Sequence, residues 1–438
     1  MCTNRRFLPL VATILLLSGS LSGQSLKLDR QRGEVMLEGL RRDLEEQYFD
    51  PTFRGLDLPA RIEAARSRVR SAASLGEVFT AVAQVAVDLK DSHTRFYPPA
   101  RATRVDYGWV VTFVGDRAHI SWISKESDAQ KQGVAIGDRV LQVAGYTPTR
   151  ENHSLLLYLL NALRPQPRLA VVLENKAGVR RSLQLAAAIE QGRAQLDARN
   201  ENDMDAMARQ YERLTSGGAR HEHHALSDTV HLWRMPSFDL ARAEIDAQFD
   251  KFRRTAGTLI VDLRGNGGGS EESMLRMLGS LFDRDLTIGT LHERKGPRPL
   301  VARTRGKDKA YAGKVVVLVD SESASAAEVV ARTLQLERRG TVVGDRTAGM
   351  VMRGVFNRHK VGTEVSIYYG VSVTVADLVH PDGRSLEGTG VTPDLVLLPT
   401  PEDMELRRDP VLSNVARTLD VALAPDAAYR IYNTGRDQ

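Results

Sequence analysis

Three serines, Ser321, Ser323 and Ser325, lie between a predicted strand and a predicted helix. The strand is the β-branched run at 315–319, and the helix begins with Ala-Ala-Glu-Val-Val at 326–330. A strand, a tight turn and a helix in this order present a serine hydroxyl at the end of a sheet. Unpaired N–H groups at the helix start can then stabilise an oxyanion. The pattern predicts a candidate nucleophile, although serines at a helix start are more often caps.

A glycine-rich stretch, Gly-Asn-Gly-Gly-Gly-Ser at 265–270, follows an apolar run at 258–263. Glycines let backbone N–H groups approach a reacting carbonyl without obstruction by Cβ, which suits an oxyanion hole. A plain structural turn fits the same pattern, and so does a dinucleotide-binding turn with Asp283 or Asp285 as the ribose ligand. Ser270 occupies the third glycine position of that fingerprint, and no Gly-Lys-Ser/Thr follows for a P-loop. The pattern favours an oxyanion turn and leaves the other two interpretations open.

Composition and charge narrow the class of protein. The chain has 438 residues, 42% hydrophobic and 26% charged, which predicts a globular protein of two or three domains. The formal net charge is +5, but basic and acidic residues alternate along the chain rather than cluster. We therefore expect neither a nucleic acid nor an anionic membrane as partner.

The first residues have the pattern of a secretory signal. Arg5 and Arg6 precede an apolar run at 7–17, and small residues follow at 18–23. The run is too short for a bilayer span, so we predict a removable signal peptide at 1–23 and no stable membrane anchor. This predicts export, to a periplasm or to the outside of the cell. The single cysteine, Cys2, lies in this segment, so the processed chain would have no disulfide and no thiolate nucleophile.

An N-terminal helical domain is predicted at 24–100. Apolar side chains recur at helical spacing in three successive segments, which predicts helices at about 29–50, 62–72 and 74–89. A polar turn, Lys-Asp-Ser-His-Thr at 90–94, comes next, and the pair Pro98-Pro99 soon follows it. This turn is predicted to be a loop.

From 101 to 190 the pattern changes to short alternating strands. Gly-Val-Ala-Ile-Gly-Asp-Arg-Val-Leu-Gln-Val-Ala-Gly at 133–145 resembles a PDZ domain. A helix at about 150–163 and a strand at 169–174 complete the resemblance. A PDZ domain would bind an extended chain end by strand addition, with Tyr107, Gly108 and Trp109 as the carboxylate-capturing loop. A small β domain that only packs is the alternative.

An α/β core is predicted at 191–402. Residues 191–220 are polar and suit a connector, and strands and helices alternate after them, which implies a largely parallel sheet covered by helices. Strands return at 351–398, including 364–369 and 371–375. Residues 403–438 are predicted as a helix-prone tail with a disordered end. The predicted fold class is therefore multidomain α+β: a helical segment, a PDZ-like β domain and an α/β core.

Four motifs in order make the chain similar to the carboxyl-terminal processing (tail-specific) serine peptidases and their tricorn-like relatives. They are Leu-Lys-Asp-Ser-His-Thr at 89–94, Asp-Leu-Arg-Gly-Asn-Gly-Gly-Gly at 262–269, Ser-Ala-Ser-Ala-Ala-Glu at 323–328 and Leu-Glu-Gly-Thr-Gly-Val-Thr-Pro-Asp at 386–394. The resemblance implies a crotonase- or Clp-like βαβ peptidase core. It also implies that Ser325 is the nucleophile, with Glu328 as the marker of its motif.

The resemblance also shows where this chain departs from the processing peptidases. Their Ser-Lys dyad takes its lysine from a position that Met350 occupies here, and methionine has no titratable group. The tricorn-like branch instead uses a Ser-His pair, and the matching residues here are His93 as base, with Glu387 and Ser92 to orient it. A neutral imidazole can accept the hydroxyl proton near pH 7. His380 is the alternative base.

Backbone amides would complete the predicted site. The amide of Ala326, just after the nucleophile, would pair with that of Gly267 or Gly268 as the oxyanion hole. The run His-Glu-His-His at 221–224 lacks the i, i+4 spacing of a metallopeptidase helix, so no metal and no other cofactor is predicted.

The predicted function is therefore that of an exported serine endopeptidase that acts on proteins or peptides. The resemblance is also compatible with an oligomer. Two alternatives remain open. A non-catalytic relative of the same fold would bind peptides or apolar ligands, since the dyad lysine is lost at Met350. A nucleotide-binding enzyme is the third alternative.

Overall fold

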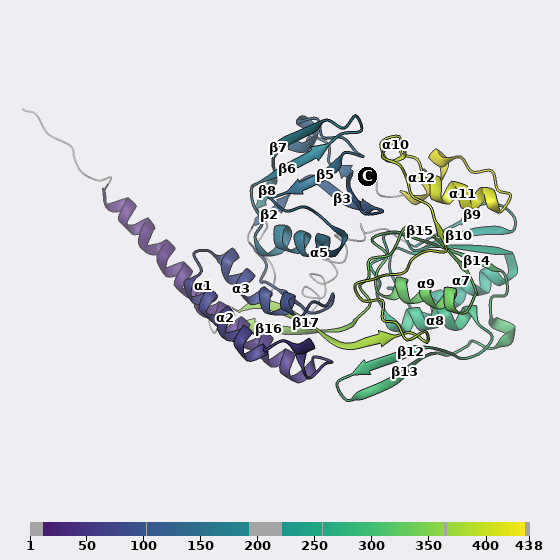
Figure 1. Ribbon diagram of the computed structural model, residues 1–438, viewed down its shortest axis with the longest axis horizontal. Coiled ribbons are helices and arrows are strands. Elements are labelled where there is room, and N and C mark those ends of the chain that lie inside the picture. The colour runs from purple at the N-terminus through teal and green to yellow at the C-terminus, as the bar shows by residue number, and fades with distance from the viewer. Residues whose placement is uncertain (1–11, 102, 192–220, 256, 363–365, 434–438) are drawn as a thin grey trace, which may run out of the picture.

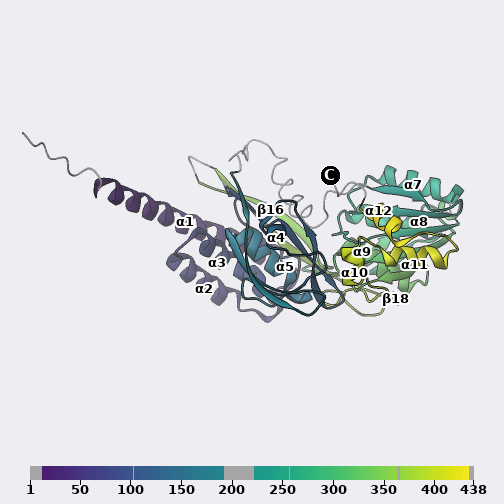
Figure 2. The ribbon, with the colours of Figure 1, turned by 90° about the horizontal axis from the view of Figure 1, so that it is seen from above.

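The computed structural model describes residues 12–101, 103–191, 221–255, 257–362 and 366–433, with only the backbone path given for 12–24. The N-terminal helices lie at one end of the molecule and the α/β core at the other. A β-rich region lies between them (Figures 1 and 2).

The core is built on a six-stranded sheet in the order β18-β15-β14-β11-β10-β9. All neighbouring strands are parallel except β9, which is antiparallel to β10. The strands are β9 (Glu222–Ala225), β10 (Val230–Arg234), β11 (Thr258–Asp262), β14 (Lys314–Val319), β15 (Thr341–Gly344) and β18 (Leu395–Val396).

Helices cover both faces of this sheet because its central strands are apolar on both faces. Leu259 and Val261 pack on one face with α7 (Arg242–Thr255), α8 (Glu271–Leu281) and α9 (Ala326–Leu336). Ile260 points to the other face, where it packs with α11 (Pro410–Thr418) and α12 (Pro425–Tyr432). The carboxyl ends of β11 and β14 therefore open at one edge of a covered parallel sheet, where α/β proteins commonly place a site.

A second sheet joins the core to the N-terminal helices. Its order is β1-β17-β12-β13, and β16 also pairs with β17. Strand β17 is 13 residues long, so it reaches β1 at 370–372 and β12 at 376–379. The strands are β1 (Arg95–Tyr97), β12 (Leu286–Glu293), β13 (Gly296–Ala302), β16 (Arg353–Val361) and β17 (Ile367–Val379). The chain just before β1, which holds His93, is thereby attached to the core.

Three helices precede β1: α1 (Ala12–Gln47), α2 (Leu58–Ser71) and α3 (Leu75–Asp88), with the short η1 (Phe53–Gly55) between the first two. Asp57 and Ser74 cap α2 and α3 by accepting backbone N–H bonds. The buried faces of the helices share one apolar cluster with Tyr369 and Val371 of β17. The described residues include no helix both long enough and apolar enough to cross a membrane.

The region between the helices and the core contains a five-stranded antiparallel sheet, in the order β3-β4-β5-β6-β7. Helix α5 packs on β3, where the His153 ring meets Phe113 edge-on with centroids 5.1 Å apart. The elements are β2 (Thr103–Asp106), β3 (Trp109–Val114), β4 (Arg117–Ile123), α4 (Asp128–Lys131), β5 (Arg139–Val143), α5 (Arg150–Tyr158), η2 (Leu159–Leu163), β6 (Arg168–Glu174), β7 (Arg180–Ala186) and β8 (Ala188–Gln191), which pairs with β2.

This region is attached to the core by buried polar contacts. Arg150, at the start of α5, pairs with Asp345 at 3.2 Å and donates to the carbonyl of Gly115 at 2.8 Å. Thr112 on β3 donates to Glu322 at 3.0 Å, three residues before Ser325. The β-rich region therefore lies directly against the turn that carries Ser325.

Several sequence expectations are corrected. Two strands were expected at 364–369 and 371–375, but a single strand, β17, runs through the boundary between them. It does so because Gly370 continues the ladder opposite Arg358. The hairpin β12–β13 was not predicted. The tail predicted as helix-prone at 403–438 does contain helices α11 and α12, and Leu412 and Val415 of α11 bury against the sheet; residues 434–438, where a disordered end was predicted, lie outside the described residues. Short helices α10 (Pro401–Glu405) and η3 (Lys307–Lys309) complete the fold. Nearly all of the predicted connector, 192–220, lies outside the described residues, as do 1–11.

Candidate active site

The turn that carries the candidate nucleophile, called the nucleophile turn below, runs from the end of β14 to the start of α9. Ser325 is the last residue before the helix and has a φ of 54°, a left-handed conformation that a serine rarely adopts. Its amide donates to the carbonyl of Met350 at 2.9 Å and to Glu328 Oε2 at 3.1 Å. These bonds hold the strained backbone, so the side chain projects from a fixed position.

The other two serines of the cluster have structural partners. Ser323 is fully buried, and its hydroxyl donates to the carbonyl of Leu263 at 2.8 Å. The hydroxyl of Ser321 donates to the carbonyl of Phe113 at 2.6 Å. Among the described residues, the Ser325 hydroxyl donates no hydrogen bond, and its oxygen lies in a capping box with the Glu328 amide. Of the three, Ser325 is the serine whose hydroxyl is free to react.

The glycine loop packs directly on Ser325. A Cβ added to Gly268 would lie 2.6 Å from the Ser325 Cβ and 3.1 Å from its Oγ, so only glycine fits there. The Gly268 amide, however, donates to Asn266 Oδ1 at 2.8 Å. In this conformation it is not free for an oxyanion, which corrects the Gly268 alternative. The amides of Gly267 and Ala326 make no such bond within the described part of the chain.

The turn that carries His93 is fixed by one carboxylate. Asp91 Oδ1 accepts from the amides of His93 and Thr94, at 3.0 and 2.6 Å, and from the Thr374 hydroxyl at 2.6 Å. Asp91 Oδ2 accepts from the Tyr48 hydroxyl at 2.9 Å. The turn is thus attached to both α1 and β17, which is why the helical segment presents its histidine to the core.

Ser92 connects His93 to Glu387. The Ser92 Oγ lies 2.7 Å from His93 Nδ1 and donates to Glu387 Oε2 at 2.9 Å. A hydroxyl has one proton, and here it points to the carboxylate, so Nδ1 must carry the proton that Ser92 accepts. His93 Nε2 is then the nitrogen with a free lone pair. This is the tautomer that a general base for Ser325 requires.

Burial shifts the pKa values of both His93 and Glu387. Desolvation lowers the pKa of His93 to about 4, against the charge of Asp91, which raises it. The imidazole is therefore neutral at pH 7 and can accept a proton. Burial also raises the pKa of Glu387, although its bonds from the amide of Val351 and from Ser92 lower it.

We call the hydrogen-bonded series His93–Ser92–Glu387 the relay. It is connected to Ser325 through the backbone of residues 350 and 351. The Val351 amide donates to Glu387 Oε2 at 3.0 Å, and the carbonyl of the preceding Met350 accepts the Ser325 amide. The hydrogen bonds of the described residues include none between the Ser325 Oγ and the His93 ring. Catalytic hydrogen bonds are often long in a free enzyme, so the arrangement still allows a base and a nucleophile to meet when substrate binds.

Glu328 has a larger role than a sequence marker. It is fully buried, and it accepts bonds from the Thr347 hydroxyl and from the amides of Gly349, Met350 and Ser325. Burial raises its pKa to about 7, against the four hydrogen bonds, which lower it. The carboxyl group therefore holds the loop at 347–350 against the nucleophile turn. The Ser-x-x-Glu spacing of a capping box was the signal for this role.

Tyr107 and Gly108 of the predicted carboxylate-capturing loop already form hydrogen bonds with other residues of the chain. Tyr107 is buried, and its hydroxyl donates to the carbonyl of Leu160 at 3.1 Å. The Gly108 amide donates to Asp106 Oδ1 at 2.9 Å, and Trp109 begins β3. In this conformation the Gly108 amide is not available to a chain-end carboxylate, which corrects that part of the prediction.

The remaining histidines lie elsewhere. His380 is buried just after β17 and lines a hollow with Glu337, which caps the end of α9 opposite Ser325, so it does not join the site as the alternative base. His223 lies 2.8 Å from both His231 and Lys251, an arrangement of nitrogen contacts rather than metal ligands. No group of three or more acidic, histidine or cysteine side chains suited to a metal occurs in the described residues.

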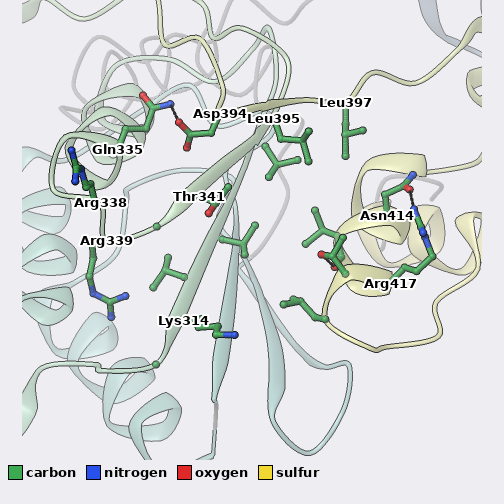
Figure 3. A pocket seen from close by; sticks show the side chains of 18 of the residues that line it. Lys314, Gln335, Arg338, Arg339, Thr341, Asp394, Leu395, Leu397, Asn414 and Arg417 are labelled. Carbon is green, nitrogen blue, oxygen red and sulfur yellow. Dashed lines mark hydrogen bonds between the residues drawn. The ribbon is translucent and has the colours of Figure 1, made fainter.

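A cavity of about 850 Å³ lies at the other end of the core sheet, between the starts of β14 and β15 and helix α11 (Figure 3). Lys314 and Thr341 at those strand starts line it, as do Asn414 and Arg417 of α11. Because Ser325 follows the carboxyl end of β14, this cavity is not the place of the chemistry described above.

Comparison with known proteins shows similarity to peptidases. Residues 230–397 match the family described as peptidase family S41. The chain is 35% identical over 150 residues to the chloroplastic C-terminal processing peptidase of Tetradesmus obliquus, covering 34% of this chain and 30% of that protein. It is 24% identical over 358 residues to the chloroplastic carboxyl-terminal-processing peptidase 1 of Arabidopsis thaliana, covering 78% of this chain and 66% of that protein.

The fold also resembles solved structures. Mature CPAF, in complex with lactacystin, matches with a TM-score of 0.64 at 16% identity, covering 93% of this chain and 99% of that chain. At this identity the likeness concerns the fold alone. The two curated relatives are similar to this chain over less than two thirds of their own length, namely 30% and 66%.

Proposed function

We propose that this chain, whose residues 230–397 belong to the S41 family of serine peptidases, is an active endopeptidase with Ser325 as nucleophile and His93 as base. The observation that carries the proposal is the relay from His93 Nδ1 through Ser92 to Glu387. Such a relay orients the imidazole and stabilises its charged form, which is the arrangement needed when the opposite ring nitrogen, Nε2, accepts a proton.

The reaction follows from the positions of these groups. Ser325 Oγ attacks the carbonyl carbon of the scissile peptide while His93 Nε2 takes its proton. The amides of Gly267 and Ala326 donate to the oxyanion of the tetrahedral intermediate. The imidazolium then gives its proton to the leaving amine, which leaves an acyl group on Ser325. Water, activated by the neutral His93, hydrolyses this ester and restores the serine.

Glu387 and Ser92 stabilise the imidazolium rather than react themselves. When His93 gains a proton, its Nδ1–H bond to Ser92 becomes charge-assisted, and Ser92 transmits the negative charge of Glu387. Met350, at the position of the lysine in a Ser-Lys dyad, contributes only its backbone, which accepts the Ser325 amide. The Ser-His branch of the resemblance is therefore the mechanism we propose.

The proposed substrates are proteins or peptides, and no cofactor takes part. Residues 101–190 would act as a PDZ domain and receive an extended chain end along β3, an outermost strand of its sheet, whose Phe113 carbonyl now accepts the Ser321 hydroxyl. Capture of a carboxylate would first require the Gly108 amide to leave Asp106. We also propose that residues 1–23 direct export and are removed.

A non-catalytic binding protein is the second candidate. The observation that favours it is the lack, in the described residues, of a hydrogen bond between the Ser325 Oγ and His93, together with Met350 in place of a lysine. Such a protein would keep the fold and bind a peptide or an apolar ligand without cleaving it.

Two experiments decide between the candidates. Purified Ser325→Ala and His93→Ala variants are assayed on an intrinsically disordered protein, with Ser71→Ala, an exposed change at the end of α2, as the matched control. We expect cleavage by the wild type and the control and none by the two variants. Fluorophosphonate labelling of Ser325 in the wild type supports an enzyme. No labelling, under conditions that label a control peptidase, supports the binding protein.

A further inference from the structure

A buried charge cluster connects the C-terminal helices to the start of the glycine loop. Arg264, two residues after the end of β11, donates from Nε to Asp262 at 2.9 Å and from one terminal nitrogen to Asp409 at 3.0 Å. Its other terminal nitrogen lies 2.7 Å from Asp262 and 2.8 Å from Asp409. The side chains are 9%, 1% and 5% exposed in the order Arg264, Asp262 and Asp409. One guanidinium is thus shared by two buried carboxylates.

Helix α12 closes the cluster. The Tyr432 ring lies over the Arg264 guanidinium at 4.5 Å and over that of Arg234 at 4.9 Å. An aromatic face is attracted to a cation at this distance. Burial disfavours the charged form of Arg264, but the carboxylates of Asp262 and Asp409 outweigh it and keep its pKa above the ordinary value. The guanidinium therefore stays charged and depends on both carboxylates.

The loop that follows Arg264 carries the proposed oxyanion donor. The Gly265 amide donates to Asp320 at 2.9 Å, and the Asn266 side chain donates to the carbonyl of Met235 at 2.6 Å. The Gly267 amide comes next, before Gly268 packs on Ser325. The loop is held from both sides, and Arg264 is the contact through which the C-terminal helices hold it.

Asp409 has a second function that fixes its own position. It caps α11 by accepting the Leu412 amide at 3.0 Å. Leu412 and Val415 of that helix are buried against the core sheet. The carboxylate that Arg264 contacts is therefore attached to a packed helix rather than to a free chain end.

We propose that Asp409 and Tyr432 are positioning residues of the active site, which act through Arg264 to set the Gly267 amide at oxyanion distance from the substrate. The proposal rests on the proposed peptidase function. An oxyanion donor is effective only within about 2.7–3.1 Å of the developing charge, so a small displacement of the loop lowers the rate. Neither residue touches substrate, so binding is unaffected.

The test is Asp409→Asn in the full chain. Asparagine is also a good helix cap, so α11 is retained while the second negative charge at Arg264 is lost. We expect kcat on a disordered protein to fall about 10- to 100-fold, with KM within about twofold, by comparison with the loss of an oxyanion donor. The rate of fluorophosphonate labelling of Ser325 should fall in parallel, because the phosphyl oxygen occupies the same position.

The matched control is Asp246→Asn on α7. Asp246 pairs with Arg276 at 2.5 Å and with Arg305 at 3.4 Å, and none of these three side chains hydrogen-bonds to the glycine loop at 265–270 in the described part of the chain. This change should lower thermal stability without altering kcat at temperatures where the protein is folded. If Asp409→Asn folds and keeps kcat within about twofold of the wild type, the proposal is overturned. If it does not fold, Tyr432→Leu, a half-buried change near the chain end, is measured in its place and decides by the same criterion.

Hydrogen–deuterium exchange separates this proposal from the proposed function. The amides of 262–270 should exchange faster in Asp409→Asn than in the wild type, whether or not the protein cleaves anything. Unchanged exchange overturns the positioning role. Faster exchange in Asp409→Asn, together with a wild type that neither cleaves nor labels, would refute the peptidase and retain the structural connection.

Discussion

Replacing Ser92 by alanine tests the relay on which the mechanism depends. The change removes one hydroxyl and with it two hydrogen bonds, the 2.7 Å contact to His93 Nδ1 and the 2.9 Å bond to Glu387. The backbone of residue 92 still donates to Glu387 Oε1 at 2.7 Å, and Asp91 still holds the turn. The histidine should therefore stay in place and lose only its orienting partner.

The magnitude follows from the charge that develops on His93. In the transition state the imidazolium loses a hydrogen bond to a group that is itself bonded to a carboxylate. Hydrogen bonds to charged groups contribute about 1.5–3 kcal/mol. At about 1.4 kcal/mol per factor of ten, kcat/KM should fall about 10- to 150-fold. KM should change little, because Ser92 lies behind the ring and away from the substrate.

The assay is steady-state cleavage of an unfolded protein, with kcat and KM determined separately and thermal unfolding measured on the same preparations. Ser92→Thr retains the hydroxyl and should keep most of the activity, and Ser71→Ala serves as the exposed control. A Ser92→Ala enzyme with kcat/KM within about threefold of the wild type would refute the relay.

Three further predictions follow from buried charges. Burial lowers the pKa of His93 to about 4, so kcat/KM should stay level from pH 7 to pH 5 and decline only as pH approaches 4; a limb near 6.5 would contradict this. Burial raises the pKa of Glu328 from 4.5 to about 7. The free energy of unfolding should therefore fall as pH rises through that window. Urea denaturation of Glu328→Gln should show this slope removed and a loss of at least about 2 kcal/mol, since the amide NH₂ would face the two donors that now point at one carboxylate oxygen. Arg150→Ala leaves the Asp345 carboxylate unpaired and should cost about 3–5 kcal/mol. Calorimetry should then show the 101–190 region unfolding separately from the core, whereas one unchanged transition would count against the contact.

Local patterns were sufficient for the elements and for a serine cluster between a strand and a helix, whereas the choice of Ser325 among the three serines came from the family resemblance. The three N-terminal helices, the alternating core and the turn at Ser325 follow from apolar periodicity and from the capping chemistry around Glu328. Such patterns act within one or two turns of the chain, which is why they can be read without the fold. The substitution of Met350 for a lysine was also visible in the sequence alone, and it directed attention to His93.

Contacts between distant segments were not predictable in the same way. Asp262, Arg264 and Asp409 look like ordinary charged residues in the sequence, and the tail after residue 403 gave no sign that its helices contact the glycine loop. The amides of Gly108 and Gly268 were predicted to be free, and each is bonded within its own loop. Which donor finds which acceptor depends on loop geometry, and residue type does not specify it.

The sequence alone determined the type of each group in the proposed site: a serine in a strand-to-helix turn, a histidine in a polar turn and a glycine loop without Cβ atoms. Only the tertiary structure decided their relation. Ser92 and Glu387 are 295 residues apart in the chain, and the second sheet, through β1 and β17, brings them to within 2.7 Å. The physical reason is that a proton relay needs atoms within hydrogen-bond distance, and that distance is set by packing across the whole fold.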